Sequence, residues 1–356
     1  MSNSVSPARS LLVVRLGAMG DVIHTAAAVS AVRNAFPDIR IGWTVEQRWA
    51  ELLCAKDAGL SGPRDAFRPV VDFVHVVNTK AWRKSLLSTA TRGQIAAALA
   101  EVRDQHYDFA IDFQGAIKSA VVARLSGAKQ IIGMAHPREW PARMLYTQLV
   151  ETKGSHVIDH YHSLAEATLE KFLPACSAIL PADQRSGRNV RDLPPSGERF
   201  AVINPGAGWA AKQWPADRYG AVAKALAGCG FIPLVNFGPG EEALASAAER
   251  ASGGAARPIS CTLGELIALL RRSRLFIGGD TGPLHLAAAL QVPVVAIFGP
   301  TDPARNGPYG TRSIVLRNDE SCTSLSHTSE PDPGLLNITA DEVITAARRL
   351  LEESPA

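Results

Sequence analysis

The sequence predicts an α/β protein built from two doubly wound domains that face each other across a cleft. Short apolar runs, typical of buried strands, alternate with segments of helical periodicity in both halves of the chain. Glycine-containing turns follow several of the expected strands. A polar, proline-containing segment at 181–199 separates the two halves, so we expect domains over residues 1–185 and 196–356.

The overall composition indicates a globular protein of two domains and argues against several other classes of protein. The 356 residues are 46% hydrophobic and 20% charged, as in an ordinary globular protein of two domains. A formal net charge of +3 gives no reason to expect nucleic acid as a partner. The five cysteines form no CxxC pair, which argues against a disulfide framework or a zinc knuckle. With no apolar signal segment and no apolar run long enough to span a bilayer, we expect a cytoplasmic protein whose membrane contact is at most peripheral.

The first strand is expected at 11–14, followed by a glycine turn and a helix at 22–36. Arg15 stands where a dinucleotide-binding fingerprint has its first glycine, so a nicotinamide enzyme is a weak interpretation. Asp21 stands at the helix start, where it either caps the helix or acts as a general base toward a substrate hydroxyl. His24 follows on the same helical face and can orient Asp21 or a ligand, although a single histidine there is more often structural.

Further strands are expected in the N-terminal half at 39–45, 73–77, 107–113 and 131–134. Helices are expected at 93–104 and 156–172, and also after the strand at 107–113 and after the strand at 131–134. After the strand at 73–77, a loop carries Lys80, Arg83 and Lys84 around Trp82. These cations either form a solvated loop or receive a polyanionic ligand or an anionic membrane surface. The helix at 156–172 carries three histidines, but no carboxylate or cysteine completes a ligand set, so we expect no metal site.

The C-terminal half repeats the pattern with a strand at 200–203, a glycine-rich loop at 204–215 and a helix at 216–228. Lys212 in that loop is a candidate to neutralise a phosphate. After a strand at 232–237, Glu241 and Glu242 begin a helix, where they either interact with the helix dipole or hold a ribose diol. Further helices are expected at 263–272 and 339–353; the last is capped by Thr339 and can pack back on the N-terminal domain.

The most informative stretch is LFIGGDTGPLH at 275–285, which reads as strand, tight turn and helix. Asp280 or Thr281 can cap the helix, and Pro283 suits an early helical position. The free N–H groups and the dipole at such a helix start favour a diphosphate, whereas the alternative is an ordinary capped turn. A neighbouring strand at 292–298 ends in a second glycine turn, so two polar loops are expected at the sheet edge where ligands bind in open α/β sheets.

Three motifs together resemble one known family. RLGAMGDVIHT near the start, DFQGAIKS in the middle and GGDTGPLHLAAAL followed by FGPTDPARNGPYG near the end resemble the ADP-heptose:lipopolysaccharide heptosyltransferases of glycosyltransferase family 9. This family has the GT-B fold of two Rossmann-like domains. The histidine three residues after the aspartate in GDVIHT resembles the type I enzymes, which add the first heptose to Kdo on lipid A.

The resemblance implies a role for each matching residue. Asp21 would be the catalytic base of an inverting transfer from ADP-heptose. The donor would be bound by Lys212, Glu241, Glu242, Asp280, Thr281, Gly282 and His285. The Kdo-lipid A acceptor would be bound by Gly20, His24, Lys80, Arg83, Lys84, Asp112, Gln114 and Arg138. One departure is that Ala207 and Gly208 stand where some members have hydroxyl residues, so phosphate contacts from that loop would come from backbone N–H groups.

The implied enzyme needs no cofactor, since no DxD motif for a metal is present, although Mg²⁺ can still assist. Its partners would be ADP-heptose, the lipid acceptor and the anionic cytoplasmic face of the inner membrane, without nucleic acid. Several alternatives stay open. They are a type II heptosyltransferase or another ADP-sugar transferase of the family, a non-hydrolysing nucleotide-sugar epimerase, and a nucleotide-binding protein without catalysis.

Overall fold

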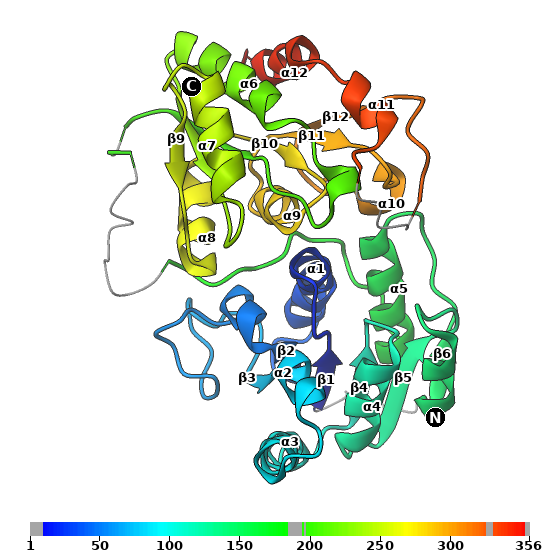
Figure 1. The fold of residues 1–356 in the computed structure, drawn as a ribbon. Helices are drawn as coiled ribbons and strands as arrows, with labels where there is room; N and C mark the ends of the chain where they lie inside the picture. Colours follow the sequence, from blue (N-terminus) through cyan, green and yellow to red (C-terminus); the bar gives the residue numbers. More distant parts are fainter. Residues whose placement is uncertain (1–9, 184–193, 196, 325–329, 353–356) are drawn as a thin grey trace. The chain divides into compact units, whose positions relative to one another are not determined.

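The computed structural model describes residues 10–183, 194–195, 197–324 and 330–352. The chain divides into two compact units, Met1–Gln184 and Arg185–Ala356. Each contains a six-stranded, wholly parallel sheet with helices on both faces, as Figure 1 shows. The predicted class of two doubly wound α/β domains is thereby confirmed. Most of the predicted linker, 184–193 and residue 196, lies outside the described residues.

The sheet of the first unit has the strand order β3-β2-β1-β4-β5-β6. Its strands are β1 (Ser10–Val14), β2 (Arg40–Glu46), β3 (Phe73–Val77), β4 (Phe109–Asp112), β5 (Gln130–Met134) and β6 (Gln148–Val150). All five residues of β1 are buried, because a central parallel strand is covered by helices on both faces. The order reverses between β1 and β4, and such a reversal opens a crevice at the carboxyl ends of the strands.

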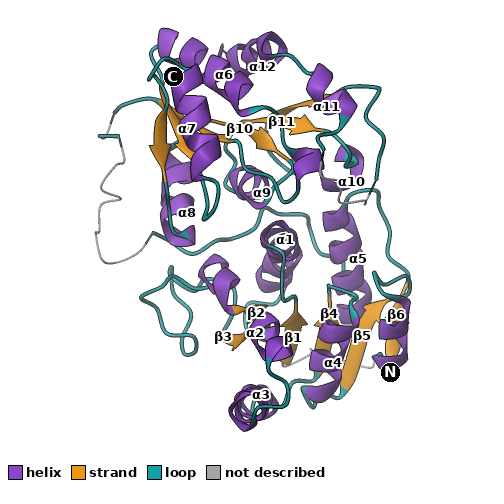
Figure 2. Cartoon of the chain, viewed as in Figure 1, coloured by secondary structure: helices purple, strands orange, loops and turns teal. Residues whose placement is uncertain are grey.

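Helices of the first unit lie on both faces of this sheet, with α1 and α5 on one face and α3 and α4 on the other (Figures 1 and 2). The helical segments are α1 (Met19–Ala35), α2 (Thr79–Lys84), α3 (Thr89–Arg103), α4 (Ile117–Leu125) and α5 (Val157–Leu169), with 3₁₀ turns η1 (Gln47–Leu52) and η2 (Trp140–Leu145). The basic segment expected to be a loop is therefore the short helix α2. Asn78 begins it by accepting a hydrogen bond from Ala81 N–H through its side chain.

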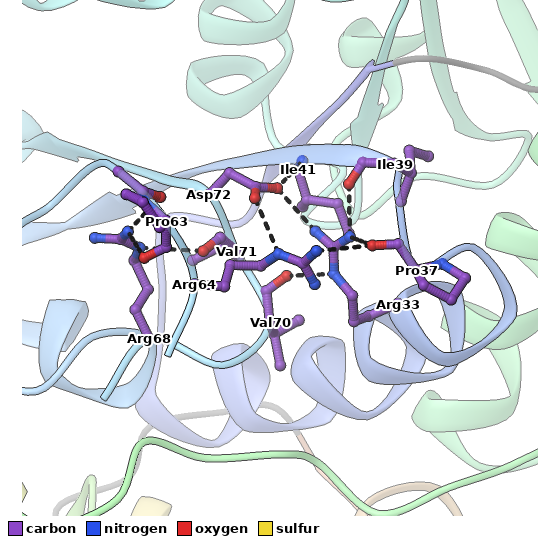
Figure 3. Close-up of polar contacts among 11 residues, drawn as sticks. Arg33, Pro37, Ile39, Ile41, Pro63, Arg64, Arg68, Val70, Val71 and Asp72 are labelled. Atoms are coloured by element: carbon purple, nitrogen blue, oxygen red, sulfur yellow. Dashed lines mark hydrogen bonds and ion pairs between the residues drawn. The ribbon is translucent and has the colours of Figure 1, made fainter. Parts of the chain in front are cut away.

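The connection between η1 and β3 contains no helix or strand, yet buried arginines hold it in place (Figure 3). Arg33 of α1 pairs with Asp72 at 2.8 Å and donates to the carbonyl of Val70. Arg68 donates to the carbonyl oxygens of Pro63 and Val71. Each guanidinium offers several donors in a fixed geometry, so it satisfies carbonyl groups that have no ladder partner.

The second unit repeats the plan with the order β12-β11-β10-β7-β8-β9. Its strands are β7 (Phe200–Asn204), β8 (Ile232–Asn236), β9 (Arg257–Ile259), β10 (Leu275–Gly279), β11 (Val294–Phe298) and β12 (Ser313–Arg317). Its helices are α6 (Ala216–Gly228), α7 (Glu242–Ala251), α8 (Leu263–Arg272), α9 (Gly282–Ala289), α10 (Pro303–Asn306), α11 (Pro333–Asn337) and α12 (Ala340–Glu352), with the 3₁₀ turn η3 (Ala210–Lys212). In Figure 1, α6, α7 and α12 cover one face of this sheet, and α8 and α9 cover the other.

The final helix α12 belongs to the core of the second unit. Val343, Ala347 and Leu350 are buried in the same cluster as Val222 of α6 and Val295 of β11. Its amphipathic face packs on the sheet and helices of its own unit. The expectation that this helix also packs back on the N-terminal domain stays a prediction. The predicted cap is confirmed, since Thr339 and Glu342 exchange hydrogen bonds in a capping box.

None of the helices in the described ranges is long and apolar enough to cross a membrane. In the segment at 319–334, Asp332 accepts a hydrogen bond from Ser321 Oγ at 2.6 Å and begins α11 by accepting one from Leu335 N–H. Residues 325–329 of that segment lie outside the described residues.

Candidate active site

At the switch point of the first sheet, two hydrogen bonds join the loop after β1 to the loop after β4. Leu16 N–H donates to Gln114 Oε1 at 3.0 Å, and Arg15 donates to the carbonyl of Phe113 at 2.6 Å. Arg15 is buried, and its guanidinium lies over the ring of Tyr161 at 5.5 Å. The glycine turn before Asp21 is thus fixed by the neighbouring strand as well as by its own helix.

Asp21 is the third residue of α1, and its side chain is 35% exposed. Its Oδ2 accepts a hydrogen bond from Ala18 N–H at 3.2 Å and forms an ion pair with Arg15 at 2.5 Å. Part of its role is thus to complete the helix start, although the N-cap residue is Ala18 and Asp21 contributes from the third helical position. Both of these contacts fall on Oδ2 of the Asp21 carboxylate.

Three other residues expected to bind a ligand near Asp21, namely Gly20, His24 and Asp112, are buried and contact other protein groups. Gly20 and His24 are buried in α1, and the His24 ring lies edge-on to the His156 ring with 5.6 Å between centroids. Asp112 is fully buried, and it accepts hydrogen bonds from Ser119 Oγ, Tyr146 OH and the backbone N–H groups of Gln114 and Gly115. Burial raises the pKa of Asp112, and these four donors partly offset that effect. The structure therefore shows Asp112 holding the turn after β4, and its predicted contact with an acceptor stays a prediction.

A pocket of about 720 Å³ lies at the carboxyl ends of the first sheet's strands. Gly17 and Ala18 of the turn before Asp21 line one end of it. Five cations also line it, of which three were predicted and two, Arg48 and Lys118, were not: Arg48, Lys80, Arg83, Lys118 and Arg138. Gln114 lines it too, whereas Lys84 is exposed on α2 outside this lining. The concentration of cations suits an acceptor that carries carboxylates or phosphates.

The two acidic side chains in this pocket are both engaged by neighbouring donors. Glu46 accepts a hydrogen bond from Thr79 N–H at 3.2 Å, and Glu139 accepts one from Ile117 N–H at 2.8 Å. Thr44, which is fully buried and lines the same pocket, has a hydroxyl with no hydrogen-bond partner among the described residues. Such a hydroxyl is available to a ligand's polar group.

In the second unit, Lys212, Asp280 and His285 form a buried polar cluster across the switch point between β7 and β10. Lys212 Nζ contacts Asp280 Oδ2, His285 Nε2 lies 3.1 Å from Asp280 Oδ1, and the ammonium lies 4.0 Å from the centre of the Trp209 ring. Burial by itself would raise the pKa of Asp280, but hydrogen bonds and charge from His285 and Lys212 outweigh it and hold that pKa well below its usual range. The structure thus brings Lys212 to the predicted donor residues Asp280 and His285, although Lys212 is 68 residues from Asp280 in sequence.

The start of α9 offers backbone donors without a side-chain cap. Thr281 is the N-cap residue, but its hydroxyl donates to the carbonyl of Gly279 at 3.2 Å, and Asp280 faces Lys212 instead. The prediction that either side chain caps this helix is therefore wrong, because each has a stronger partner. The N–H groups from Gly282 onward meet no capping side chain, which favours an anion there.

Glu241 and Glu242 differ clearly in position. Glu241 Oε2 accepts a hydrogen bond from Gly238 N–H at 2.8 Å, and its carboxylate occupies the space that a Cβ at Gly206 would need. It therefore lies against the glycine-rich loop after β7. Glu242 is exposed in the first turn of α7. Of the two, Glu241 is the one placed to meet a ligand of that loop.

This difference predicts unequal effects on nucleotide binding. Glu241→Gln keeps an acceptor for Gly238 N–H but replaces the second oxygen by a donor, so we expect ADP to bind about 10-fold more weakly. Glu242→Gln is the matched control and should leave the affinity unchanged. Isothermal titration calorimetry with ADP measures both. Equal affinities for the two variants would remove Glu241 from the ribose site.

No group of three or more His, Cys, Asp or Glu residues within the described ranges is arranged to hold a metal ion. Two of the three histidines near α5 make other contacts instead. His160 shares a hydrogen bond with Thr152 at 2.7 Å, and His156 accepts one from Ile158 N–H at 3.1 Å.

Comparison with known proteins identifies the class. A family model described as glycosyltransferase family 9 (heptosyltransferase) matches residues 95–333, and the chain belongs to this family of glycosyltransferases. The resemblance seen in the sequence motifs is thereby confirmed.

The chain is also similar to individual proteins of this family. Lipopolysaccharide heptosyltransferase 1 of Pseudomonas aeruginosa is 30% identical over 323 residues, which is 88% of this chain and 84% of the relative. Among solved structures, E. coli heptosyltransferase WaaC with ADP matches with a TM-score of 0.77 and 26% identity, over 96% of this chain and 99% of that one. The same enzyme with ADP-2-deoxy-2-fluoro heptose matches with a TM-score of 0.75 and 25% identity over the same shares. Both structures have the GT-B fold that the motifs implied.

Proposed function

We propose that this protein transfers L-glycero-D-manno-heptose from ADP-heptose to Kdo of lipid A, with inversion, in the assembly of the lipopolysaccharide inner core. The observation that carries the proposal is Asp21, a partly exposed carboxylate that stands beside a pocket rich in cations. The relative from Pseudomonas aeruginosa is a lipopolysaccharide heptosyltransferase 1, which supports the choice of heptose and of the first transfer step.

The second unit would bind the donor. Lys212 and the uncapped start of α9 are suited to the diphosphate, and Glu241 to the ribose. Solved structures of the related E. coli enzyme with ADP and with an ADP-heptose analogue support this assignment. Because Ala207 and Gly208 carry no hydroxyl, their loop would contribute backbone N–H groups alone.

The first unit would bind the acceptor. Kdo carries a carboxylate and lipid A carries phosphates, so the five cations of the pocket match the charge of that acceptor. Arginines can bind such groups through two parallel hydrogen bonds, which fixes orientation as well as charge. Gln114 would act indirectly, because its amide oxygen is already used to hold Leu16 N–H.

The transfer would be a single displacement. The Asp21 carboxylate takes the proton of the acceptor hydroxyl while that oxygen attacks the anomeric carbon of the heptose. The bond from that carbon to the diphosphate oxygen breaks, and ADP leaves with the electron pair. Lys212 and the N–H groups at the start of α9 would stabilise the charge that develops on the leaving diphosphate. Attack opposite to the leaving group inverts the configuration, and no cofactor is required.

The acceptor is a lipid, so we propose that the enzyme works in the cytoplasm as a peripheral protein on the inner membrane. The decisive experiment is incubation of the purified protein with ADP-heptose and Kdo-lipid A while ADP release is measured, with and without EDTA. We expect release that depends on the acceptor and persists in EDTA. Release without acceptor, or a preference for lipid A that already carries a heptose, would contradict the proposal.

A further inference from the structure

The first unit exposes an unusual number of large apolar side chains in a limited part of the chain. Of thirteen exposed large hydrophobic residues in the described ranges, seven lie between residues 86 and 144. The most exposed of these seven are Leu87 at 85%, Met144 at 76% and Trp140 at 66%. Single exposed apolar residues are normal on a protein surface, but a contiguous group indicates a contact with another apolar phase.

Most of these residues lie on elements that are neighbours in the structure. Ile117, Val121 and Leu125 are exposed at four-residue spacing and so form one stripe along α4. The 3₁₀ turn η2, which carries Trp140 and Met144, packs against α4. We call this group, together with Leu86 and Leu87 between α2 and α3, the apolar face.

The apolar face adjoins the mouth of the cationic pocket. Leu86, Val121 and Leu125 belong to the apolar face and also line that pocket, as do Ile95 and Leu99 of α3. In Figure 1, α2, α3 and α4 lie on the side of the first sheet away from α1. A lipid whose polar head enters the pocket would therefore have its acyl chains beside exposed apolar side chains.

The charge around the apolar face is strongly positive. Residues 79–99, 116–125 and 138–145 contain eight Lys or Arg residues and one acidic residue, Glu139. The whole chain carries a formal charge of only +3, so positive charge is concentrated here. Cations that surround exposed Leu, Trp and Met side chains are the combination that binds an anionic bilayer surface.

We propose that the apolar face is the membrane-docking surface, and that Leu87, Trp140 and Met144 enter the headgroup region of a bilayer containing anionic phospholipid. This inference rests on the proposed function, because the lipid acceptor explains why the pocket opens beside that surface. Docking here lets an acceptor reach the pocket while its acyl chains stay in the bilayer. The exposed cations attract the anionic headgroups, and the apolar side chains insert between those headgroups.

The test is co-sedimentation of the full-length protein with phosphatidylcholine vesicles that contain or lack phosphatidylglycerol. We expect wild type to bind the anionic vesicles, and Leu87→Glu and Trp140→Glu to bind at least about 10-fold more weakly, because each places a carboxylate in the headgroup region. Phe172→Glu is the matched control, since Phe172 is 77% exposed in the same unit but outside the apolar face. All three variants should turn over a deacylated, water-soluble acceptor at the wild-type rate.

Several outcomes overturn the inference. Leu87→Glu and Trp140→Glu could bind vesicles as well as wild type does, or Phe172→Glu could lose binding to the same extent. Light scattering could instead show a dimer that Leu87→Glu dissociates, which would assign the apolar face to a second copy of the chain. Failure of the proposed function is recognised separately, as absence of ADP release with either acceptor in the wild-type protein.

Discussion

Asp21→Asn is expected to leave the protein folded and to lower kcat by at least about 100-fold, since a positioned general base contributes about 10² to 10⁴ in rate. Asparagine keeps a carbonyl oxygen that can accept the hydrogen bond from Ala18 N–H, so the start of α1 should persist. It lacks the basic oxygen that would take the proton of the acceptor hydroxyl. The measurement is steady-state ADP release together with thermal unfolding followed by circular dichroism.

The matched control for this variant is Asp217→Asn. Asp217 is also an acidic residue in the first turn of a helix, but it is exposed on α6 of the second unit. If Asp21 were only part of a helix start, both substitutions would cost a similar, small amount of stability and little activity. Turnover by Asp21→Asn within a few-fold of wild type would return Asp21 to that structural role.

Lys212→Ala should weaken ADP binding by roughly 10- to 100-fold, the equivalent of about 1.5–3 kcal/mol for hydrogen bonds to a charged group. Lys212 supplies the ammonium group of the cluster that it forms with Asp280 and His285. Calorimetric titration with ADP measures the loss. Lys224→Ala, an exposed lysine on α6, should bind ADP as wild type does.

The same substitution has a second effect that the experiment must separate. Removal of Lys212 leaves Asp280 buried with His285 as its remaining partner, so the melting temperature should fall. Titration well below that temperature isolates the contribution of Lys212 to binding. Unchanged affinity in the folded variant would exclude a contact between Lys212 and the diphosphate.

Local patterns predicted much of the fold. The buried strand before Asp21, the succession of strand, turn and helix over 275–285 and the cap at Thr339 each depend on residues close in sequence, and all three were found. The strands β6, β9 and β12 were missed. The first two have three residues each and β12 is only partly buried, so none has the apolar run that marks a central strand.

The arrangement of the site depended on contacts that the sequence does not encode locally. Lys212 and Asp280 are 68 residues apart and meet only because β7 and β10 are neighbours in the sheet. Arg48 and Lys118 join the pocket for the same reason, since each follows a different strand of one sheet. Asp112 lies in a polar motif of the sequence. One of its hydrogen-bond donors, Tyr146, nevertheless comes from the segment after β5 and could not be identified from that motif.

The two hydrogen bonds between the loops after β1 and β4 hold one end of the pocket more firmly than the other, so the two ends differ in how readily substitutions can alter them. Arg15 and Gln114 tie the end next to Asp21 to a central strand, so that end resists remodelling. Arg48, Lys118 and Arg138 stand on separate, solvent-exposed elements and can be exchanged one at a time. Single substitutions in the outer wall could therefore alter the charge of the pocket while the end next to Asp21 keeps its geometry.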